Sequence, residues 1–529
     1  MSQTSPATPR THEHGPPKAA ATNLEPAHST QNEPVIQSPP ATAAATAPYS
    51  SFSKKQKHLI IALASISATF SGFASNIYFP AIPTIAASLG TTEANINLTV
   101  TGYMVFQAIS PTFWGAVSDV YGRRLTLLCT FIVFLSACIG LALSNHFYQL
   151  LILRCLQSTG SASTIAIGSG VIGDITTREE RGGYMGVFQT GLLAPLAIGP
   201  VLGGIFADTL GWRSIFWFLT IYSGVYLIIL VLFLPETLRS IVGNGSRLPY
   251  KQARTPFEKY IANRDQDQPS PPPTSGGHRN NEKKELKIDF MAPIRILFQK
   301  EVICVLIFLS VHYATWQMTL TIQSTLFSQI YGLADIQIGL TFLANGAGCM
   351  IGTLSTGKIL DRDYKKIQRS FAQGSNLSGD ANANHKGERE GEFPIEKARL
   401  RTLYLWAPIQ WSSIIIFAWT IDKHSHISIP IIASFTLAWS AMSIQSVIST
   451  FLVDIFPGNS ASATAALNLG RCLVGALATG TIEPSIRGIG VGASFMIWLA
   501  GMVLSMGLVG VQMRFGPSWR KKREEGGDR

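Results

Sequence analysis

Long apolar segments separated by short polar stretches recur along most of the chain. About 20 mostly apolar residues are enough for a helix to cross the hydrocarbon core of a bilayer, and twelve segments approach or exceed that length. The pattern therefore predicts an all-α membrane protein with twelve transmembrane helices. The expected spans are 59–79, 96–117, 125–144, 148–172, 183–206, 214–234, 301–325, 336–360, 402–421, 427–453, 460–482 and 491–513.

Hydrophilic segments divide the twelve spans into two sets of six. Residues 1–57 are rich in Pro, Ala, Thr and Ser and cannot bury a core, so they predict a disordered tail. Residues 239–295 contain a proline-rich run and predict a flexible linker. The remaining parts are an N-terminal half at 58–238, a C-terminal half at 296–515 with a hydrophilic loop at 361–401, and a tail at 516–529.

The charged residues predict how the chain is oriented in the membrane. The formal net charge is +11, but the cations lie between the apolar segments and form no basic face, which argues against nucleic-acid binding. Lys54, Lys55 and Lys57 precede the first span, and Arg520–Arg523 follow the last. Because cytoplasmic segments carry an excess of Lys and Arg, we expect both termini, the linker and the loop in the C-terminal half to be cytoplasmic.

Cysteine usage gives no sign of a metal site or a disulfide framework. All six cysteines fall inside expected spans, and none has the spacing of metal ligands. We interpret them as packing residues and expect neither a metal nor another cofactor.

A polar segment of fixed pattern joins the second and third expected spans. It reads Gly-x-x-x-Asp-x-x-Gly-Arg-Arg, with Gly115, Asp119, Gly122, Arg123 and Arg124 at its defined positions. Glycine permits close approach and turning, and the aspartate can cap a helix or pair with an arginine. We expect this segment to be a gating motif at the cytoplasmic surface.

The chain repeats this pattern in its second half. Gly357 and Asp361 recur at the end of the eighth span with the same separation, with two cations at the matching offset and Tyr364 in place of the second glycine. Asp174 after the fourth span and Asp454 after the tenth form another matched pair. Internal repeats of this kind predict two pseudo-symmetric six-helix halves with a site between them.

Two arginines inside the expected spans are the first candidates for a substrate or coupling site. Intramembrane charges are costly and usually face a cavity or a partner. Arg154 lies in the fourth span beside Gln157, and Arg471 lies in the eleventh beside Asn468. The alternative for either arginine is a structural role, such as a tie to backbone carbonyls.

Uncharged polar residues in the spans complete the candidate list. Asn76, Gln107 and Asn345 either line the cavity or hold helices together. His312 and Trp316 lie one turn apart and share a helix face, which predicts either an aromatic pocket with a titratable neighbour or core packing.

Acidic residues are missing from the middle of the spans that would surround a central site. No Asp or Glu lies well inside spans 1, 4, 5, 7, 8 or 11, and Glu483 lies only at the outer end of span 11. Arginine stays protonated and cannot carry the transported proton, but it can hold a carboxylate. Two such cations favour an acidic substrate that is bound as an anion and released outside.

The motif between spans 2 and 3 resembles that of the major facilitator superfamily. Span 4 carries Arg154–Gly160, and span 5 carries Gly199, Pro200, Gly203 and Gly204; both resemble motifs of the drug:proton antiporter branch. In that branch, the span-5 motif is associated with export. Proline removes a helix hydrogen bond, and the glycines permit close packing and bending.

Further stretches are similar to a fungal subgroup that contains citrate exporters and quinidine-resistance pumps. They are 75–81, 170–176, 213–220, 339–343, 393–396 and 460–465. Citrate-exporter-like relatives tend to carry an arginine in span 5, whereas Gln189–Leu193 contains no cation here. That departure argues for a monocarboxylic or dicarboxylic substrate over a tricarboxylate.

The resemblance implies a monomeric multi-pass transporter of the plasma membrane, with an organelle membrane as the alternative. We expect its two halves to rock around a central site and to export a small organic acid or secondary metabolite by proton antiport. The rival functions are a broad-specificity drug:proton antiporter and a transport-inactive sensor, and intact Asp119, Arg124 and Arg154 argue against the sensor. A membrane enzyme is disfavoured, because the sequence shows neither a nucleophile paired with a base nor a metal-binding pattern.

Overall fold

The computed structural model describes residues 52–244, 292–377, 394–456 and 460–527, which belong to one compact unit, Pro48–Arg529. Most of the expected N-terminal tail and most of the central linker lie outside the described residues. The first helix begins inside the expected tail, at Lys54 rather than near Leu59. It starts there because Ser53 and Gln56 form a capping box, in which each side chain bonds to the other's backbone N–H.

Within the described residues, twelve helices of 20 or more residues form two sets of six, as the hydrophobic pattern predicts. The N-terminal half contains α1 (Lys54–Asn76), α3 (Glu93–Tyr121), α4 (Arg123–Ala142), α5 (Phe147–Ile175), α6 (Arg178–Leu210) and α7 (Arg213–Phe233). The C-terminal half contains α11 (Lys300–Tyr331), α12 (Asp335–Leu377), α15 (Leu403–Asp422), α16 (Ser428–Ile455), α17 (Ser460–Ile489) and α18 (Val491–Gly527).

Ten of these helices are long and apolar enough to cross a membrane; α3 and α15 are not in that set. Both carry polar residues that face protein instead of lipid. Asn97, Thr99 and Ser110 of α3 are buried, as are Gln410 and Ser413 of α15. The polar residues lower the mean hydropathy of α3 and α15, although these side chains are buried within the bundle.

Short helices define the two ends of the bundle. At the far end, η1 (Phe79–Ala81) and α2 (Ile82–Ser88) join α1 to α3. At the motif end, Gly122 joins α3 to α4. Three more short helices complete the described structure: α8 (Arg239–Val242), α10 (Ala292–Leu297) and α14 (Ile395–Leu400).

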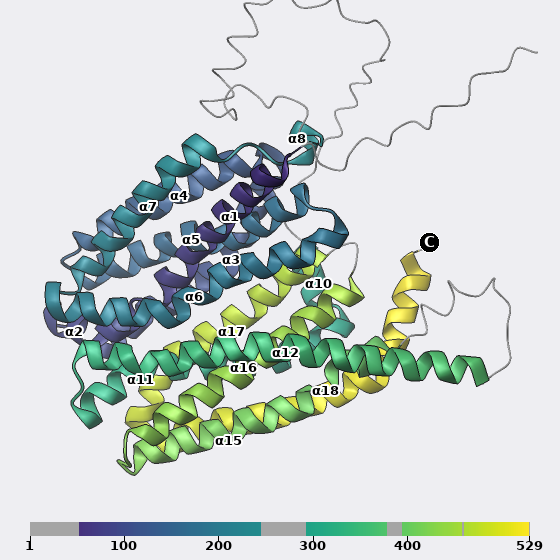
Figure 1. Ribbon diagram of the computed structural model, residues 1–529. Coiled ribbons are helices and arrows are strands. Elements are labelled where there is room, and N and C mark those ends of the chain that lie inside the picture. The colour runs from purple at the N-terminus through teal and green to yellow at the C-terminus, as the bar shows by residue number, and fades with distance from the viewer. Residues whose placement is uncertain (1–51, 245–291, 378–393, 457–459, 528–529) are drawn as a thin grey trace, which may run out of the picture. The chain divides into compact units, whose positions relative to one another are not determined.

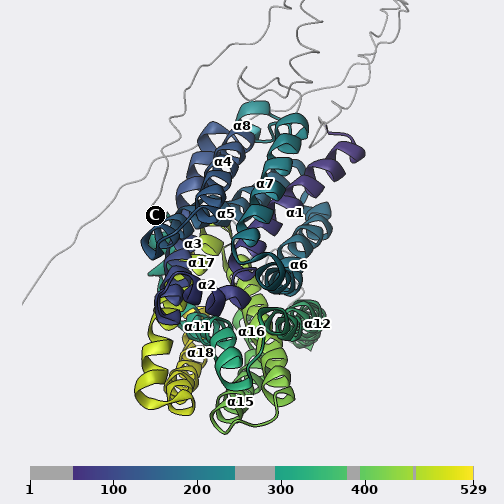
Figure 2. The ribbon, with the colours of Figure 1, turned by 90° about the vertical axis from the view of Figure 1, so that its left-hand side faces the viewer.

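The two halves meet along two helix pairs, α3 with α17 and α6 with α12, which both ribbon views show side by side (Figures 1 and 2). Small residues allow the close approach. A Cβ added at Gly204 would lie 2.4 Å from the Asp335 carbonyl oxygen, and one added at Gly339 would lie 2.6 Å from that of Pro200. Gly204 of α6 and Gly339 of α12 therefore bring these two helices into close contact.

Contacts between the halves gather toward the far end. Asn97 of α3 donates to the Glu483 carboxylate of α17 over 2.7 Å, and Thr84 of α2 donates to Asp335 of α12. Figure 1 shows α6 and α12 close together near α2 and diverging toward the motif end. Cβ positions built at Gly186 and Gly357, near that end, meet nothing within 4 Å. The halves are thus closed together at the far end and separated at the motif end.

Three segments expected to be irregular are helical. The polar motif between spans 2 and 3 lies within α3 and α4 except for Gly122, whose φ of 103° reverses the chain in one residue. Of the loop expected at 361–401, residues 378–393 lie outside the described residues; before them α12 continues to Leu377, and after them α14 covers Ile395–Leu400. The tail expected at 516–529 continues α18 to Gly527. Past its apolar segment, α18 is held by Arg523, which contacts Glu301 and the Ile455 carbonyl, whereas in α12 the Tyr364 ring lies against Arg399.

Candidate functional site

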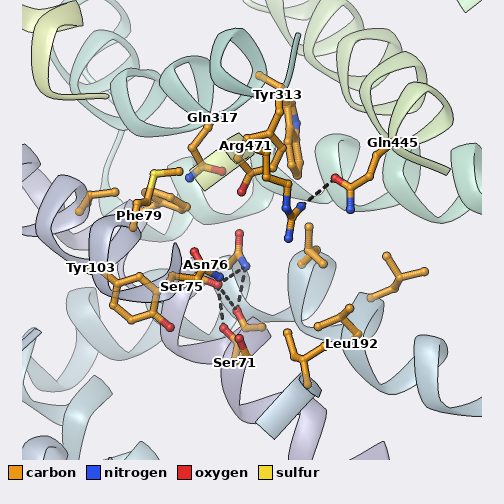
Figure 3. A pocket seen from close by; sticks show the side chains of 18 of the residues that line it. Ser71, Ser75, Asn76, Phe79, Tyr103, Leu192, Tyr313, Gln317, Gln445 and Arg471 are labelled. Carbon is orange, nitrogen blue, oxygen red and sulfur yellow. Dashed lines mark hydrogen bonds between the residues drawn. The ribbon is translucent and has the colours of Figure 1, made fainter. Parts of the chain in front are cut away.

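A central cavity lies between the two halves, and Figure 3 shows it with side chains from both. Its volume is about 100 Å³, below the roughly 300–1,000 Å³ of drug-sized ligand sites, and it is partly open to solvent. The N-terminal half contributes Ser71, Gly72, Ser75, Asn76, Phe79, Val100, Tyr103, Met104, Gln107, Arg154, Ile165, Leu192, Leu193 and Leu196. The C-terminal half contributes Tyr313, Trp316, Gln317, Met442, Gln445 and Arg471.

Arg471 of α17 projects into this cavity from the C-terminal half (Figure 3). It donates to Gln445 over 2.8 Å and to Asn468 over 2.9 Å, and its guanidinium lies 4.8 Å from the centre of the Tyr313 ring. Asn468 in turn donates to the backbone carbonyl of Gln107 across the interface (3.0 Å). No carboxylate is among the described residues that line the cavity, so Arg471 supplies a positive charge there that neutral amides position but do not compensate.

Arg154 of α5 has a different environment, although it borders the same cavity. Its side chain is only 1% exposed. Its guanidinium lies between two aromatic rings, 4.3 Å from the centre of Tyr78 and 4.6 Å from that of Tyr103. It donates to the Ala74 carbonyl (2.9 Å) and to Gln157 (2.6 Å). These contacts tie α5 to α1 inside one half, and the aromatic faces favour the charge.

The remaining sequence candidates divide between cavity and packing positions. Asn76, Gln107 and Trp316 line the cavity. Asn345 is buried and accepts the Trp316 indole hydrogen bond (3.1 Å), so it orients a cavity residue without lining the cavity itself. Gln157 is also buried, holding Arg154 and donating to the Cys138 sulfur over 3.2 Å.

His312 points away from the cavity, toward α15. Its Nδ1 lies 2.8 Å from the Phe308 carbonyl oxygen, and its Nε2 accepts from the Trp411 indole at 3.3 Å. Both ring nitrogens are thus occupied within the C-terminal half. The shared helix face expected for His312 and Trp316 does not bring the two side chains to one pocket, which favours the packing alternative for the histidine.

Sequence analysis did not single out several cavity residues. Tyr313 and Gln317 come from α11, and Gln445 comes from α16. Gln445 is the direct partner of Arg471, yet it is a lone amide in an apolar span with no motif around it. Its only sequence signal is the rule that a polar residue inside a span seldom faces lipid.

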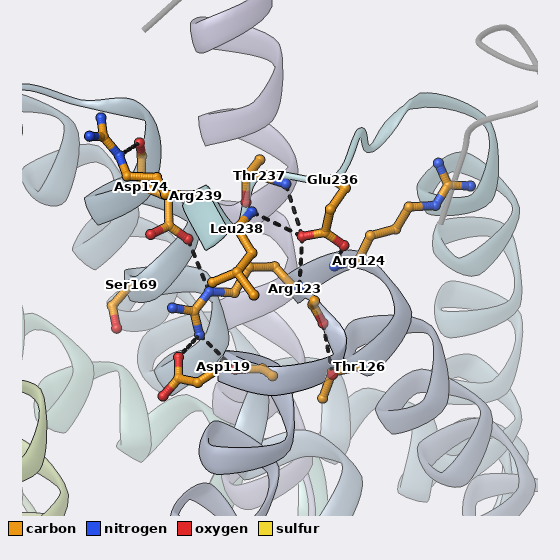
Figure 4. A network of polar contacts seen from close by, with 12 residues as sticks. Asp119, Arg123, Arg124, Thr126, Ser169, Asp174, Glu236, Thr237, Leu238 and Arg239 are labelled. Carbon is orange, nitrogen blue, oxygen red and sulfur yellow. Dashed lines mark hydrogen bonds and ion pairs between the residues drawn. The ribbon is translucent and has the colours of Figure 1, made fainter. Parts of the chain in front are cut away.

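At the motif end, Arg123 is the centre of an ionic network (Figure 4). It contacts the carboxylate of Asp119 at 2.6 Å and that of Asp174 at 3.0 Å, and it donates to the Ser118 hydroxyl at 2.6 Å. Asp119 therefore pairs with an arginine instead of capping a helix. The network links α3, α4 and α5 within the N-terminal half.

Glu236 performs the capping that the motif itself does not. Its carboxylate accepts from the backbone N–H groups of Arg123 (2.8 Å) and Arg124 (3.2 Å) at the start of α4. A Cβ at Gly122 would lie 2.4 Å from the same carboxylate, so the glycine is required for both space and backbone angle. Arg124 turns away and donates to the Leu234 and Val231 carbonyls at the end of α7, over 2.8 and 2.6 Å.

The second copy of the motif is used differently. Gly357 and Asp361 lie on α12, where Asp361 is exposed. The ion pair in this half joins Asp454 to Arg399 of α14 (2.7 Å), and the Arg399 guanidinium lies 4.4 Å from the centre of the Tyr364 ring. Arg123 begins α4, and Arg399 lies shortly before α15, so the matched arginine lies well beyond the second copy in the sequence.

The expected antiporter motif lies on α6 where two other helices converge. A Cβ at Gly203 would lie 1.9 Å from the Ile77 carbonyl oxygen, just after α1. Gly204 faces Asp335, and Pro200 faces Gly339, both on α12. Gly199 is less tightly enclosed, with its nearest neighbours 3.5 Å away. The motif thus contacts its own half on one side and the opposite half on the other.

Within the described part of the chain, no group of three or more His, Cys, Asp or Glu residues is arranged to hold a metal ion. The six cysteines are free thiols, and three of them are buried.

Comparison with known proteins gives consistent results. The family model described as Major Facilitator Superfamily matches residues 64–479. Citrate exporter 1 of Aspergillus niger is 38% identical over 478 residues, covering 90% of this chain and 89% of the relative. The MFS antiporter QDR2 of Candida albicans is 34% identical over 455 residues, covering 85% and 87%. Among solved structures, the xylose transporter XylE from E. coli has a TM-score of 0.57 at 12% identity, covering 85% and 97%, and thus shares the fold.

Proposed function

The chain belongs to the Major Facilitator Superfamily and is a membrane transporter, not an enzyme, and we propose that it exports a small organic anion by proton antiport. Its relatives include a protein named as a citrate exporter and one named as an antiporter. The proposed substrate is a metabolite with one or two carboxylates.

The observation that supports an anionic substrate most strongly is the environment of Arg471. Its guanidinium borders the cavity with neutral partners, Gln445 and Asn468, so a substrate carboxylate would meet an uncompensated cation. An arginine fork can bind a carboxylate through two parallel hydrogen bonds. Burying the anion beside this cation offsets the cost of removing its charge from water.

The number of cations supports few carboxylates on the substrate. Arg154 borders the cavity but is 1% exposed and enclosed between Tyr78 and Tyr103, so Arg471 is the more accessible arginine of the described cavity residues. Leu192 and Leu193 line the cavity in the part of α6 where citrate-exporter-like relatives tend to carry an arginine. A tricarboxylate would bring three charges to a site with one accessible counter-ion.

Alternating access would proceed by rocking the two halves around the cavity. Separation at the motif end and closure at the far end correspond to a state open on the motif side. By the positive-inside rule the motif side is cytoplasmic, so the substrate would enter from the cytoplasm and leave at the far end. We propose the plasma membrane as the location and a monomer as the working unit.

Orientation can be tested directly with a protease-cleavable tag placed in the linker 239–295 of the full chain. Protease added to intact cells should leave the tag uncut and should cut it after the membrane is permeabilised. Cleavage in intact cells would place the linker outside and contradict this arrangement.

A broad-specificity drug:proton antiporter is the second candidate. It is favoured by the aromatic and flexible apolar cavity residues, Phe79, Tyr103, Trp316, Met104 and Met442, since methionine and aromatic surfaces accommodate varied ligands. A transport-inactive sensor stays a weaker alternative, because the cavity and the ionic network at the motif end are both in place.

The deciding experiment measures transport by the purified chain in proteoliposomes with an imposed pH gradient. Monocarboxylates, dicarboxylates, citrate and an uncharged drug are offered in parallel to wild type and to Arg471→Lys, which keeps the charge but loses the planar fork. We expect the variant to lose at least tenfold in carboxylate transport and to change less than twofold with the neutral compound. Equal losses for both would make Arg471 structural, and movement of the drug alone by the wild type would favour the second candidate.

A further inference from the structure

The last turns of α18 are bound to the motif end of the C-terminal half. Arg520 lies 3.7 Å from the carboxylate of Glu396 on α14. Arg523 lies 2.6 Å from Glu301 at the start of α11 and donates to the Ile455 carbonyl at the end of α16 over 2.8 Å. Arg520 and Arg523, the first and last residues of the basic run 520–523, therefore both contact carboxylates of other helices.

The two lysines between these arginines face outward. Lys521 and Lys522 are exposed, because positions 520 and 523 share a helix face that the intervening positions do not. Lys522 borders a groove between the last turns of α18 and the first turn of α11, and the exposed Lys300 borders it from the other side. Gln299, Glu301, Trp519 and Arg523 complete the groove.

The charge of this groove is positive. Among the described residues that line it, Glu301 is the acidic one, and Arg523 neutralises it at 2.6 Å. Lys300 and Lys522 remain without an ion-pair partner among the described residues. Two lysines beside one neutralised carboxylate make a site complementary to a phosphate-bearing group.

The groove also lies at the level where two candidate membrane spans end. One span begins at Lys300 and another ends at Arg523. Figure 1 shows the end of α18, in yellow, bending away from the rest of its helix; Pro517 lies within this part. Trp519 stacks on Phe515 with ring centres 6.1 Å apart, and aromatic side chains of this kind gather at the headgroup level of a bilayer.

We propose that this groove binds the headgroup of an anionic phospholipid from the leaflet at the motif end. Lys300 and Lys522 contact its phosphate, and Trp519 lies beside the upper part of its acyl chains. The bound lipid holds the end of α18 against the start of α11 and so stabilises the motif end of the C-terminal half. This site goes beyond the proposed export function and does not depend on which solute is carried.

The test uses the full-length protein in nanodiscs of neutral phosphatidylcholine, titrated with a fluorescent phosphatidylserine. The variant Lys300→Gln/Lys522→Gln removes both groove lysines. Each basic residue near the membrane surface contributes enough attraction to change affinity roughly fivefold, so we expect the double variant to bind the anionic lipid about 25-fold more weakly. Thermal unfolding in neutral nanodiscs should be unchanged, which separates lipid binding from folding.

The matched control is Lys365→Gln/Lys366→Gln, an exposed lysine pair on the motif-end extension of α12. It removes the same charge from the same end of the bundle and should change lipid affinity less than twofold. Equal weakening by both variants would mean general surface attraction and would overturn the site. Displacement of the lipid by millimolar inorganic phosphate would also overturn it, because the groove would then be selecting a free anion.

Discussion

Arg154 and Arg471 occupy opposite halves of the internal repeat, yet their surroundings differ in kind. Arg154 is 1% exposed, enclosed by two tyrosine rings and bonded to a backbone carbonyl of α1. Arg471 is partly exposed in the cavity and is held by side-chain amides from its own helix and from α16. A repeat that preserves the type of side chain thus need not preserve its role.

The two motif copies show the same divergence at the other end of the bundle. Arg123 joins Asp119 to Asp174 in the N-terminal half, whereas Asp454 in the C-terminal half pairs with Arg399 and leaves Asp361 exposed on α12. The N-terminal half therefore joins two carboxylates to one arginine at this end, whereas the C-terminal half joins one. In the cavity, the more exposed arginine, Arg471, comes from the C-terminal half.

The largest expected effect comes from Arg154→Ala. The change opens a space between Tyr78 and Tyr103 and leaves the Ala74 carbonyl and Gln157 without their donor. Comparable losses cost about 2–5 kcal/mol, so thermal unfolding of the purified variant should begin well below that of wild type. The exposed fraction of Arg471 predicts a cost of about 1 kcal/mol or less for Arg471→Ala, judging from the usual range for partly exposed sites.

This comparison fails if both alanine variants unfold at the same temperature. An Arg154→Ala protein as stable as wild type but unable to transport would assign Arg154 a direct role in binding or coupling. Both variants are measured in the same detergent, so that its effect on the unfolding temperature is the same for each.

The next effect concerns the two motif copies. Asp119→Asn removes one of the two carboxylates around Arg123 and should slow transport at least tenfold with near-normal expression, because it shifts the balance between the two access states. Asp361→Asn makes the same chemical change at the matching position of the second copy. Since that residue is exposed and outside the Arg399–Asp454 pair, we expect less than a twofold change.

Initial transport rates of both variants, normalised to surface expression, decide this prediction. Similar losses would mean that the two copies act as one symmetric gate. No loss in either would reduce the motif to a topology signal.

The smallest expected effect is that of Pro200→Ala on α6. Restoring the missing helix hydrogen bond should stiffen a helix that contacts both halves, so transport should fall several-fold while substrate affinity stays within twofold. Ala at this position keeps the Pro200 carbonyl that lies beside Gly339. Equilibrium binding and transport are measured on the same preparation, and a variant that binds weakly but transports at the normal rate would place Pro200 in the substrate site.

The hydrophobic pattern predicted the twelve helices and their division into halves because each helix needs an apolar surface of fixed length to cross a bilayer. The same logic predicted close packing by Gly203 and Gly204, since only a missing side chain permits that approach to Ile77 and Asp335. Pairing of Asp119 with an arginine was one of two predicted alternatives. These features depend on local sequence, so a single chain reveals them.

Other features depended on where separate helices meet. The rotation of each helix about its axis, which packing determines, decides which side chains meet. It places Arg154 between Tyr78 and Tyr103. It also brings Gln445 to Arg471 and His312 to Trp411. The parts of α12 and α18 beyond their apolar segments likewise contact partners distant in sequence, Arg399 for Tyr364 and Glu301 for Arg523.

By itself the sequence determined the number of membrane helices, the family and the set of polar residues inside the spans, which must face a cavity or a partner because they are costly to expose to lipid. Only the tertiary structure decided which of those residues projects into the cavity between the halves and which is enclosed within one half. The physical reason is that both arginines carry the same cost of placing a charge inside the membrane, and this cost can be read from the sequence. The groups that offset it, namely tyrosine rings, amides and carbonyls, lie largely on other helices and are identified only by the tertiary structure.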